Sequence, residues 1–237
     1  MFTRYEPPFL NEFLDWYEYA HSWIHVICCA IAAIIAWRRT RGGAGRIIYY
    51  LLSGAFFCYA LGTLFENLYI TIYHVYPYGL SISNIPWIGV YVCFTAISFV
   101  IINGFSATER SALKRYRPAA LAISALIVLP AHVYMVYLVG MPLDNTLYAI
   151  ALFVACYYAA LLTLAAVKGN IGSEMLYYHI SVIVFVTQTV AMFLVSCFDE
   201  SPVYYLYEVF TAMHTVMPFV FLYVAKKWLS SAKEAAA

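Results

Sequence analysis

Seven stretches of mostly apolar residues divide this chain, and each is long enough to cross a lipid bilayer as a helix. A membrane-spanning helix needs roughly 20 such residues. Only 11% of the residues are charged, whereas soluble domains carry about 25%. The sequence therefore predicts an all-α, multi-pass membrane protein with a single domain over residues 1–237. The seven spans are expected at residues 14–37, 47–74, 85–106, 118–140, 146–167, 175–198 and 203–226.

The basic residues gather in alternate connections between these spans. Of the 13 lysines and arginines, 12 fall in the first, third and fifth loops or in the C-terminal tail, and Arg4 is the exception. Cytosolic loops carry an excess of Lys and Arg, so the N-terminus is expected outside and the C-terminus in the cytosol. An endoplasmic-reticulum membrane and a plasma or inner membrane both fit this pattern. No basic patch stands apart from the loops, so nucleic acid is not an expected partner.

The predicted second span contains the stretch "ALGTLFENLYITIYH", which places Glu66 beside Asn67. Ionisable residues at membrane depth are costly and usually functional. No lysine or arginine lies at the depth of Glu66, so its charge has to be removed by protonation, by a histidinium or by a metal. A carboxyl group that stays protonated away from water is a ready general acid, and Asn67 could orient it.

Other polar residues fall mainly in the same outer half of the predicted spans. The carboxylates are Glu18, Asp199 and Glu208, the amide is Gln188, and the histidines are His21, His25, His132 and His214. Their grouping predicts one polar pocket that opens towards the outer face. The alternative is that each polar group separately bonds to a neighbouring helix and holds the bundle together.

Aromatic residues make up 19% of the chain, including 23 tyrosines. Aromatic faces stabilise cations, and several aromatic side chains are expected near the carboxylates of the second and seventh spans. Those expected to contact a bound molecule are Trp23, Tyr59, Tyr69, Tyr73 and Tyr205. Ordinary belts of Tyr and Trp at the membrane interfaces are the alternative interpretation.

Seven spans in 237 residues, with one acidic residue in the second span and another in the seventh, resemble the integral-membrane terpene cyclases of meroterpenoid pathways. The resemblance implies an enzyme that protonates an epoxide or alkene of a prenyl chain and guides the cation through ring closures. It would make Glu66 and Glu208 the acidic pair.

A second resemblance covers residues 62–104. The spacing from Gly62 to Glu66, followed by a Pro-aromatic-Gly run and an Ile-Pro pair, is similar to carotenoid-hydratase-type membrane proteins. This resemblance implies the addition of water to an isoprenoid double bond.

The leading prediction is therefore a membrane-embedded isoprenoid cyclase or hydratase, a lyase or isomerase of terpenoid biosynthesis. Glu66 would be the acid, assisted by Asn67, and Glu208 with Asp199 would orient the substrate or take the final proton. Gln188 and the aromatic residues would bind the substrate, a hydrophobic isoprenoid-type molecule. Protonation alone starts such a reaction, so no cofactor is predicted.

Two alternatives remain open at this point. The first is a haem- or metal-binding membrane protein that uses Glu18, His21, His25, His132 and His214, of which His21 and His25 form an HxxxH pair. The second is a non-enzymatic receptor, carrier or assembly subunit. The six cysteines contain no CxxC pair and are expected to be small buried residues.

Overall fold

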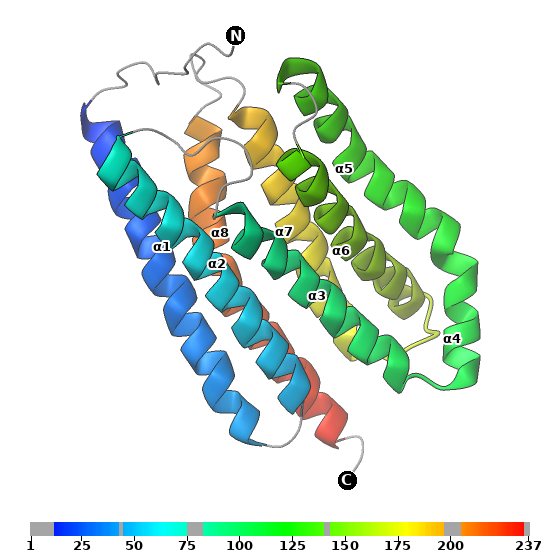
Figure 1. Ribbon diagram of the computed structural model, residues 1–237. Helices are drawn as coiled ribbons and strands as arrows, with labels where there is room; N and C mark the ends of the chain where they lie inside the picture. The colour runs from blue at the N-terminus through cyan, green and yellow to red at the C-terminus, as the bar shows by residue number, and fades with distance from the viewer. Residues whose placement is uncertain (1–11, 43–44, 75–82, 140–142, 197–204, 235–237) are drawn as a thin grey trace.

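The structure of the protein is a computed structural model that describes residues 12–42, 45–74, 83–139, 143–196 and 205–234. All the regular secondary structure in these ranges is helical, and seven of the helices are long and apolar enough to cross a membrane. The all-α, seven-span prediction is confirmed to this extent (Figure 1). The long helices are α1 (Glu12–Arg39), α2 (Arg46–Tyr73), α3 (Asn84–Gly104), α5 (Arg117–Val139), α6 (Leu143–Val167), α7 (Leu176–Val195) and α8 (Tyr205–Glu234).

The segment predicted as the third loop is instead helical. It forms α4 (Ala107–Leu113) and a 3-10 turn, η2 (Lys114–Tyr116). The Ser106 hydroxyl accepts from the backbone N–H of Glu109 at 3.3 Å, and a Glu109 carboxylate oxygen accepts from the Ser106 N–H at 2.7 Å. This reciprocal capping box satisfies two N–H groups that a helix start otherwise leaves unpaired. The segment was predicted only as a connection between two spans, and its Ser-x-x-Glu pattern accounts for the helix start.

Six of the long helices form a closed ring. Around the ring, α1 packs on α2, α2 on α3, α3 on α6, α6 on α7, α7 on α8, and α8 returns to α1. Helix α5 lies outside the ring against α6 and α7, and it is the helix at the right edge of Figure 1. Small residues on α1 and α6 are fully or almost fully buried, which lets the helix backbones approach closely. They include Ala32, Ala36, Ala155, Ala159 and Ala165.

An apolar layer of phenylalanines crosses the middle of the ring. The ring centroids of Phe94 and Phe221 lie 4.8 Å apart, and those of Phe94 and Phe185 lie 5.7 Å apart. Phe56 contacts Phe221 at 6.4 Å between centroids. These four side chains come from α2, α3, α7 and α8 and are at most 2% exposed. They form the floor of the polar region described below.

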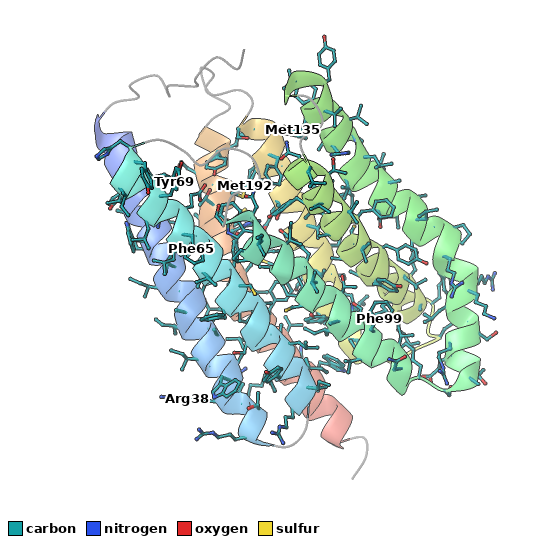
Figure 2. All side chains as sticks on the ribbon, viewed as in Figure 1. Arg38, Phe65, Tyr69, Phe99, Met135 and Met192 are labelled. Carbon is teal, nitrogen blue, oxygen red and sulfur yellow. The ribbon has the colours of Figure 1, made fainter. Side chains whose placement is uncertain are left out.

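The connections that carry basic residues share one end of the bundle. Helix α1 ends there, α2 begins there, and α8 runs towards it (Figure 1). Figure 2 shows Arg38 at this end, far from Tyr69 and Met135. Arg39 joins the first and last helices, because its guanidinium donates to the Leu222 carbonyl oxygen at 2.9 Å and lies over the Tyr49 ring.

Close packing of α2 on α3 depends on Gly62. A Cβ atom at this position would overlap the Trp87 ring and lie 3.0 Å from the Ser83 backbone oxygen. Crowding of a packed interior costs about 1–3 kcal/mol. We therefore expect Gly62→Ala to lower the free energy of unfolding by about this amount, measured by denaturant titration in lipid–detergent micelles.

Gly104 provides the matched control for this substitution. It lies in α3, the helix that packs against α2, and no neighbouring side chain stands within 4 Å of the position that its Cβ would take. Gly104→Ala should leave the free energy of unfolding unchanged or slightly raised. Equal losses in the two variants would contradict the importance of the close α2–α3 approach.

Candidate functional site

Glu66 and polar residues of three other helices lie in the half of the bundle opposite its basic end. Glu66 lies seven residues before the end of α2, and Tyr91 lies seven residues after the start of α3. Thr189 lies six residues before the end of α7, and Tyr148 lies five residues after the start of α6. With a rise of about 1.5 Å per residue, all four lie roughly 8–11 Å inside their helix ends. Helices from opposite sides of the ring therefore place polar groups at one depth.

A first hydrogen-bonded group joins α1 to α8 around the Thr215 hydroxyl. His25 Nδ1 lies 2.9 Å from this oxygen and His21 Nε2 lies 3.2 Å from it. The hydroxyl donates its one proton to the Thr211 carbonyl oxygen at 3.1 Å, so both imidazoles are then assigned as donors to its lone pairs. The second ring nitrogen of His25 meets the Cys29 sulfur at 3.5 Å. We call His21, His25, Cys29 and Thr215 the Thr215 cluster.

A second group crosses the ring from α2 to α6. The Tyr59 hydroxyl lies 2.6 Å from His214 Nδ1, and His214 Nε2 lies 3.5 Å from the Thr189 hydroxyl. Thr189 is in turn 2.7 Å from the Tyr91 hydroxyl, which is hydrogen-bonded to Tyr148. These five residues lie on five different helices. We call Tyr59, His214, Thr189, Tyr91 and Tyr148 the Tyr59 chain.

The Thr215 cluster and the Tyr59 chain touch each other. The rings of His25 and Tyr59 meet edge to face with centroids 4.4 Å apart. His214 and Thr215 are consecutive residues of α8, and the His214 ring stacks on Phe185 at 4.5 Å. Every helix of the ring contributes at least one side chain to the combined network. Because buried polar groups need partners, this network accounts for three histidines in the apolar interior.

Glu66 and Asn67 extend the same side of α2. Residues at i+7 and i+8 lie close to the face of residue i on a helix, which places both beyond Tyr59. Glu66 is half-buried and interacts electrostatically with the hydroxyls of Tyr59 and Tyr148. Asn67 is 3% exposed, and its Nδ2 has no hydrogen-bond partner among the described residues. Such a buried donor normally binds a water molecule or a ligand.

The structure separates the three tyrosines expected near Glu66. Tyr59 points into the ring, whereas Tyr69 is 39% and Tyr73 is 61% exposed. The rings of Tyr69 and Tyr73 contact each other at 4.7 Å on the outside of α2. Tyr73 is the last residue of α2.

The other predicted residues are divided between the interior and the bundle end. Gln188 is buried on α7, and its Oε1 has no partner among the described residues. Trp23 is half-buried, and its ring meets the Tyr19 ring edge to face with centroids 6.2 Å apart. Glu208 is half-buried near the start of α8, and its neighbour Tyr207 interacts electrostatically with Tyr59. Asp199 and the side chains of Glu18 and Tyr205 lie outside the part of the structure that is described.

Sequence reasoning missed five members of the network: Cys29, Tyr91, Tyr148, Thr189 and Thr215. Two signals could have found three of them. Tyr91 and Tyr148 lie more than one turn inside their helices, deeper than an interfacial belt requires. Thr215 follows His214 directly and so was close to a residue already singled out.

Two of the histidines use both ring nitrogens in contacts within the network. Both ring nitrogens of His25 are engaged, by Thr215 and Cys29, and those of His214 are engaged by Tyr59 and Thr189. His132 lies apart from them, on α5. In the part of the chain that the structure describes, no three His, Cys, Asp or Glu side chains come close enough to hold a metal ion.

His132 instead lines a small pocket between α5, α6 and α7. The pocket has a volume of about 40 Å³, and its polar lining residues are His132, Asn145 and Tyr148. A cavity needs about 10–15 Å³ to hold a water molecule. Tyr148 thus belongs both to the Tyr59 chain and to the wall of a pocket with room for water.

No protein-family model, no curated protein and no solved structure matches this chain.

The Thr215 cluster predicts a large effect of one small substitution. Thr215→Val keeps the shape of the side chain but leaves the facing nitrogens of His21 and His25 without their shared partner. Buried polar groups that lose a partner cost about 1–3 kcal/mol each. We expect the free energy of unfolding, measured by denaturant titration, to fall by at least about this amount.

Thr187→Val is the matched control. Thr187 also lies in a helix and donates to the carbonyl oxygen four residues earlier, at 2.8 Å, but its side chain is exposed on α7. Its replacement should change stability little. If both variants lost the same stability, the loss at Thr215 would come from the helix backbone bond and not from the histidines.

Proposed function

We propose that this protein is a membrane-embedded enzyme that protonates an isoprenoid chain, with Glu66 as the general acid. The observation that carries the proposal is the unpartnered, buried amide of Asn67 beside this carboxyl group. A donor without a partner at membrane depth marks a place where another molecule accepts a hydrogen bond. The carboxyl group next to it lies within electrostatic reach of two interior tyrosines.

The chemistry needs a proton and a wall that tolerates positive charge. The Glu66 proton adds to one carbon of a double bond, so a C–H bond forms and the neighbouring carbon becomes a cation. Aromatic faces stabilise such a charge. Inside the ring, Tyr59 and Tyr91 each pack against Phe185, with ring centroids 5.7 and 5.9 Å apart respectively, and these rings supply such faces.

Two endings are compatible with this start. In a cyclase, the cation closes rings and then loses a proton, which restores the Glu66 carboxyl group. In a hydratase, water adds to the cation and then releases the proton. Glu208 with Asp199 is proposed to orient the substrate or to take this final proton, and Asn67 to orient the Glu66 carboxyl group. With the basic end of the bundle in the cytosol, the site lies in the outer half of the membrane.

Glu66→Gln tests the acid directly. The amide keeps the size of the side chain but has no acidic proton, and loss of a general acid costs about a hundredfold or more in rate. Membranes that carry the wild type or the variant are supplied with farnesyl- and geranylgeranyl-bearing phenols in D₂O. Mass spectrometry should detect a product with one carbon-bound deuterium from the wild type and at least about a hundredfold less from Glu66→Gln.

Glu109→Gln is the control, because Glu109 acts in the capping box of α4 and not in the ring. It should retain full product formation. Equal product from wild type and Glu66→Gln would rule out Glu66 as the acid. Absence of any product from the wild type with either chain length would reject these substrates and the proposed reaction.

A further inference from the structure

We propose that a groove between α1 and α2 binds an acyl chain of an anionic phospholipid, and that exposed arginines at one end of the groove bind its phosphate. The two helices pack side by side at one edge of the bundle (Figure 1). The groove opens on the outer surface of the ring, away from Glu66 and the polar network. The inference therefore does not depend on the proposed function.

Small side chains from both helices give the groove its depth. Ala33 on α1 and Ser53 and Gly54 on α2 lie along its base. The groove has a volume of about 350 Å³, and pockets that bind small molecules typically have about 300–1,000 Å³. The Ser53 hydroxyl donates its only proton to the Ala33 carbonyl oxygen at 2.9 Å. These three residues therefore offer no free side-chain donor, which favours an apolar occupant.

Large apolar side chains form the walls of the groove. They are Ile34 and Trp37 on α1 and Tyr50 and Phe57 on α2, and each is between 50% and 60% exposed. The Trp37 and Tyr50 ring centroids lie 5.7 Å apart, so this pair joins the two walls. Phe57 lies seven residues after Tyr50, and the groove therefore runs for about 10 Å from the ring pair. An apolar groove of this length, open along its side to lipid, suits an extended hydrocarbon chain.

Three exposed arginines lie at the end of the groove that Trp37 and Tyr50 mark. Arg38 follows Trp37 directly, and Figure 2 shows it pointing away from the bundle. Arg41 lies in the 3-10 turn that follows α1, and Arg46 lies four residues before Tyr50 in α2. Side chains four residues apart share a helix face. The positive charges therefore lie where the apolar groove meets the membrane surface.

The sequence around these arginines contains no negative charge to neutralise them. No Asp or Glu occurs between Glu18 and Glu66. Arg39 differs from the three exposed arginines, because its guanidinium donates to the Leu222 carbonyl oxygen at 2.9 Å. Clusters of basic residues beside a membrane-spanning helix attract anionic headgroups, and Trp and Tyr favour the level of the headgroups. A phospholipid with a net negative charge therefore matches both the groove and its charged end.

The experiment follows the fluorescence of Trp37 in the full chain, placed in phosphatidylcholine nanodiscs. Bromine on an acyl chain quenches an indole ring that it touches. The nanodiscs contain increasing fractions of brominated phosphatidylglycerol, which is anionic, or of brominated phosphatidylcholine, which is zwitterionic. Subtraction of the signal of Trp37→Phe isolates Trp37. We expect half of the Trp37 signal to be quenched at an at least about tenfold lower fraction of the anionic lipid.

Two double variants test the charged end. Arg38→Gln/Arg46→Gln should raise the required fraction of anionic lipid by at least about fivefold. Lys114→Gln/Arg115→Gln is the matched control, because it removes the same charge from exposed side chains of η2, which contacts α4, α5 and α6. The control should leave the required fraction unchanged. Equal shifts in the two variants would indicate only a general attraction between charge and membrane, and would overturn the inference.

Two single variants test the groove itself. Ile34→Phe places a larger side chain in the groove and should remove the difference between the two lipids at Trp37. Ile27→Phe is the control, because Ile27 lies seven residues earlier in α1 and is 57% exposed, against 54% for Ile34, but does not line the groove. Equal quenching of the wild type by both lipids, or an unchanged difference in Ile34→Phe, would overturn the inference. So would a Trp37 that neither lipid quenches, since a protein surface would then cover the groove.

Discussion

A polar side chain inside a bilayer has to find its hydrogen-bond partner on a neighbouring helix, because lipid offers none. The ring of six helices is organised around this requirement. The Thr215 hydroxyl serves two histidines of α1, and His214 joins α2 to α7. The network lies next to the phenylalanine layer along the axis of the bundle. The interior of the ring therefore has one polar layer and one apolar layer. Hydrogen bonds in the polar layer join specific pairs of helices, and the phenylalanine rings fill the space between the helices.

Most polar side chains of this network have hydrogen-bond partners, and the buried polar atoms without one are informative. Asn67 and Gln188 are buried at the depth of the network, yet one amide atom of each has no partner among the described residues. Leaving such atoms unpaired costs free energy. Asn67 follows Glu66 directly in α2, and Gln188 directly precedes Thr189 in α7. A site for a bound molecule is the arrangement that removes this cost.

Much of the fold follows from the sequence, because the length and apolarity of a span are local properties. The depth of Glu66 also follows, since the rise per residue of a helix is fixed. The rotation of each helix about its axis does not follow. Gly62 packs against Trp87, Tyr59 points inwards to His214, and Tyr69 is exposed. His25 pairs with Thr215, 190 positions away, and His214 pairs with Tyr59, 155 positions away. No single-sequence pattern reveals such pairings.

The closure of the ring between α1 and α8 sets an order for its assembly. The Arg39 bond to Leu222 spans 183 residues, and the His21 bond to Thr215 spans 194. A chain is made from its N-terminus, so α1 enters the membrane while α8 has yet to be synthesised. Until then, the histidines of α1 face a gap in an incomplete ring. Helix α8 therefore completes the polar interior. Without it, a chain keeps Glu66 and the Tyr91–Thr189 contact but lacks His214 and Thr215, which join α1 and α2 to the rest of the network.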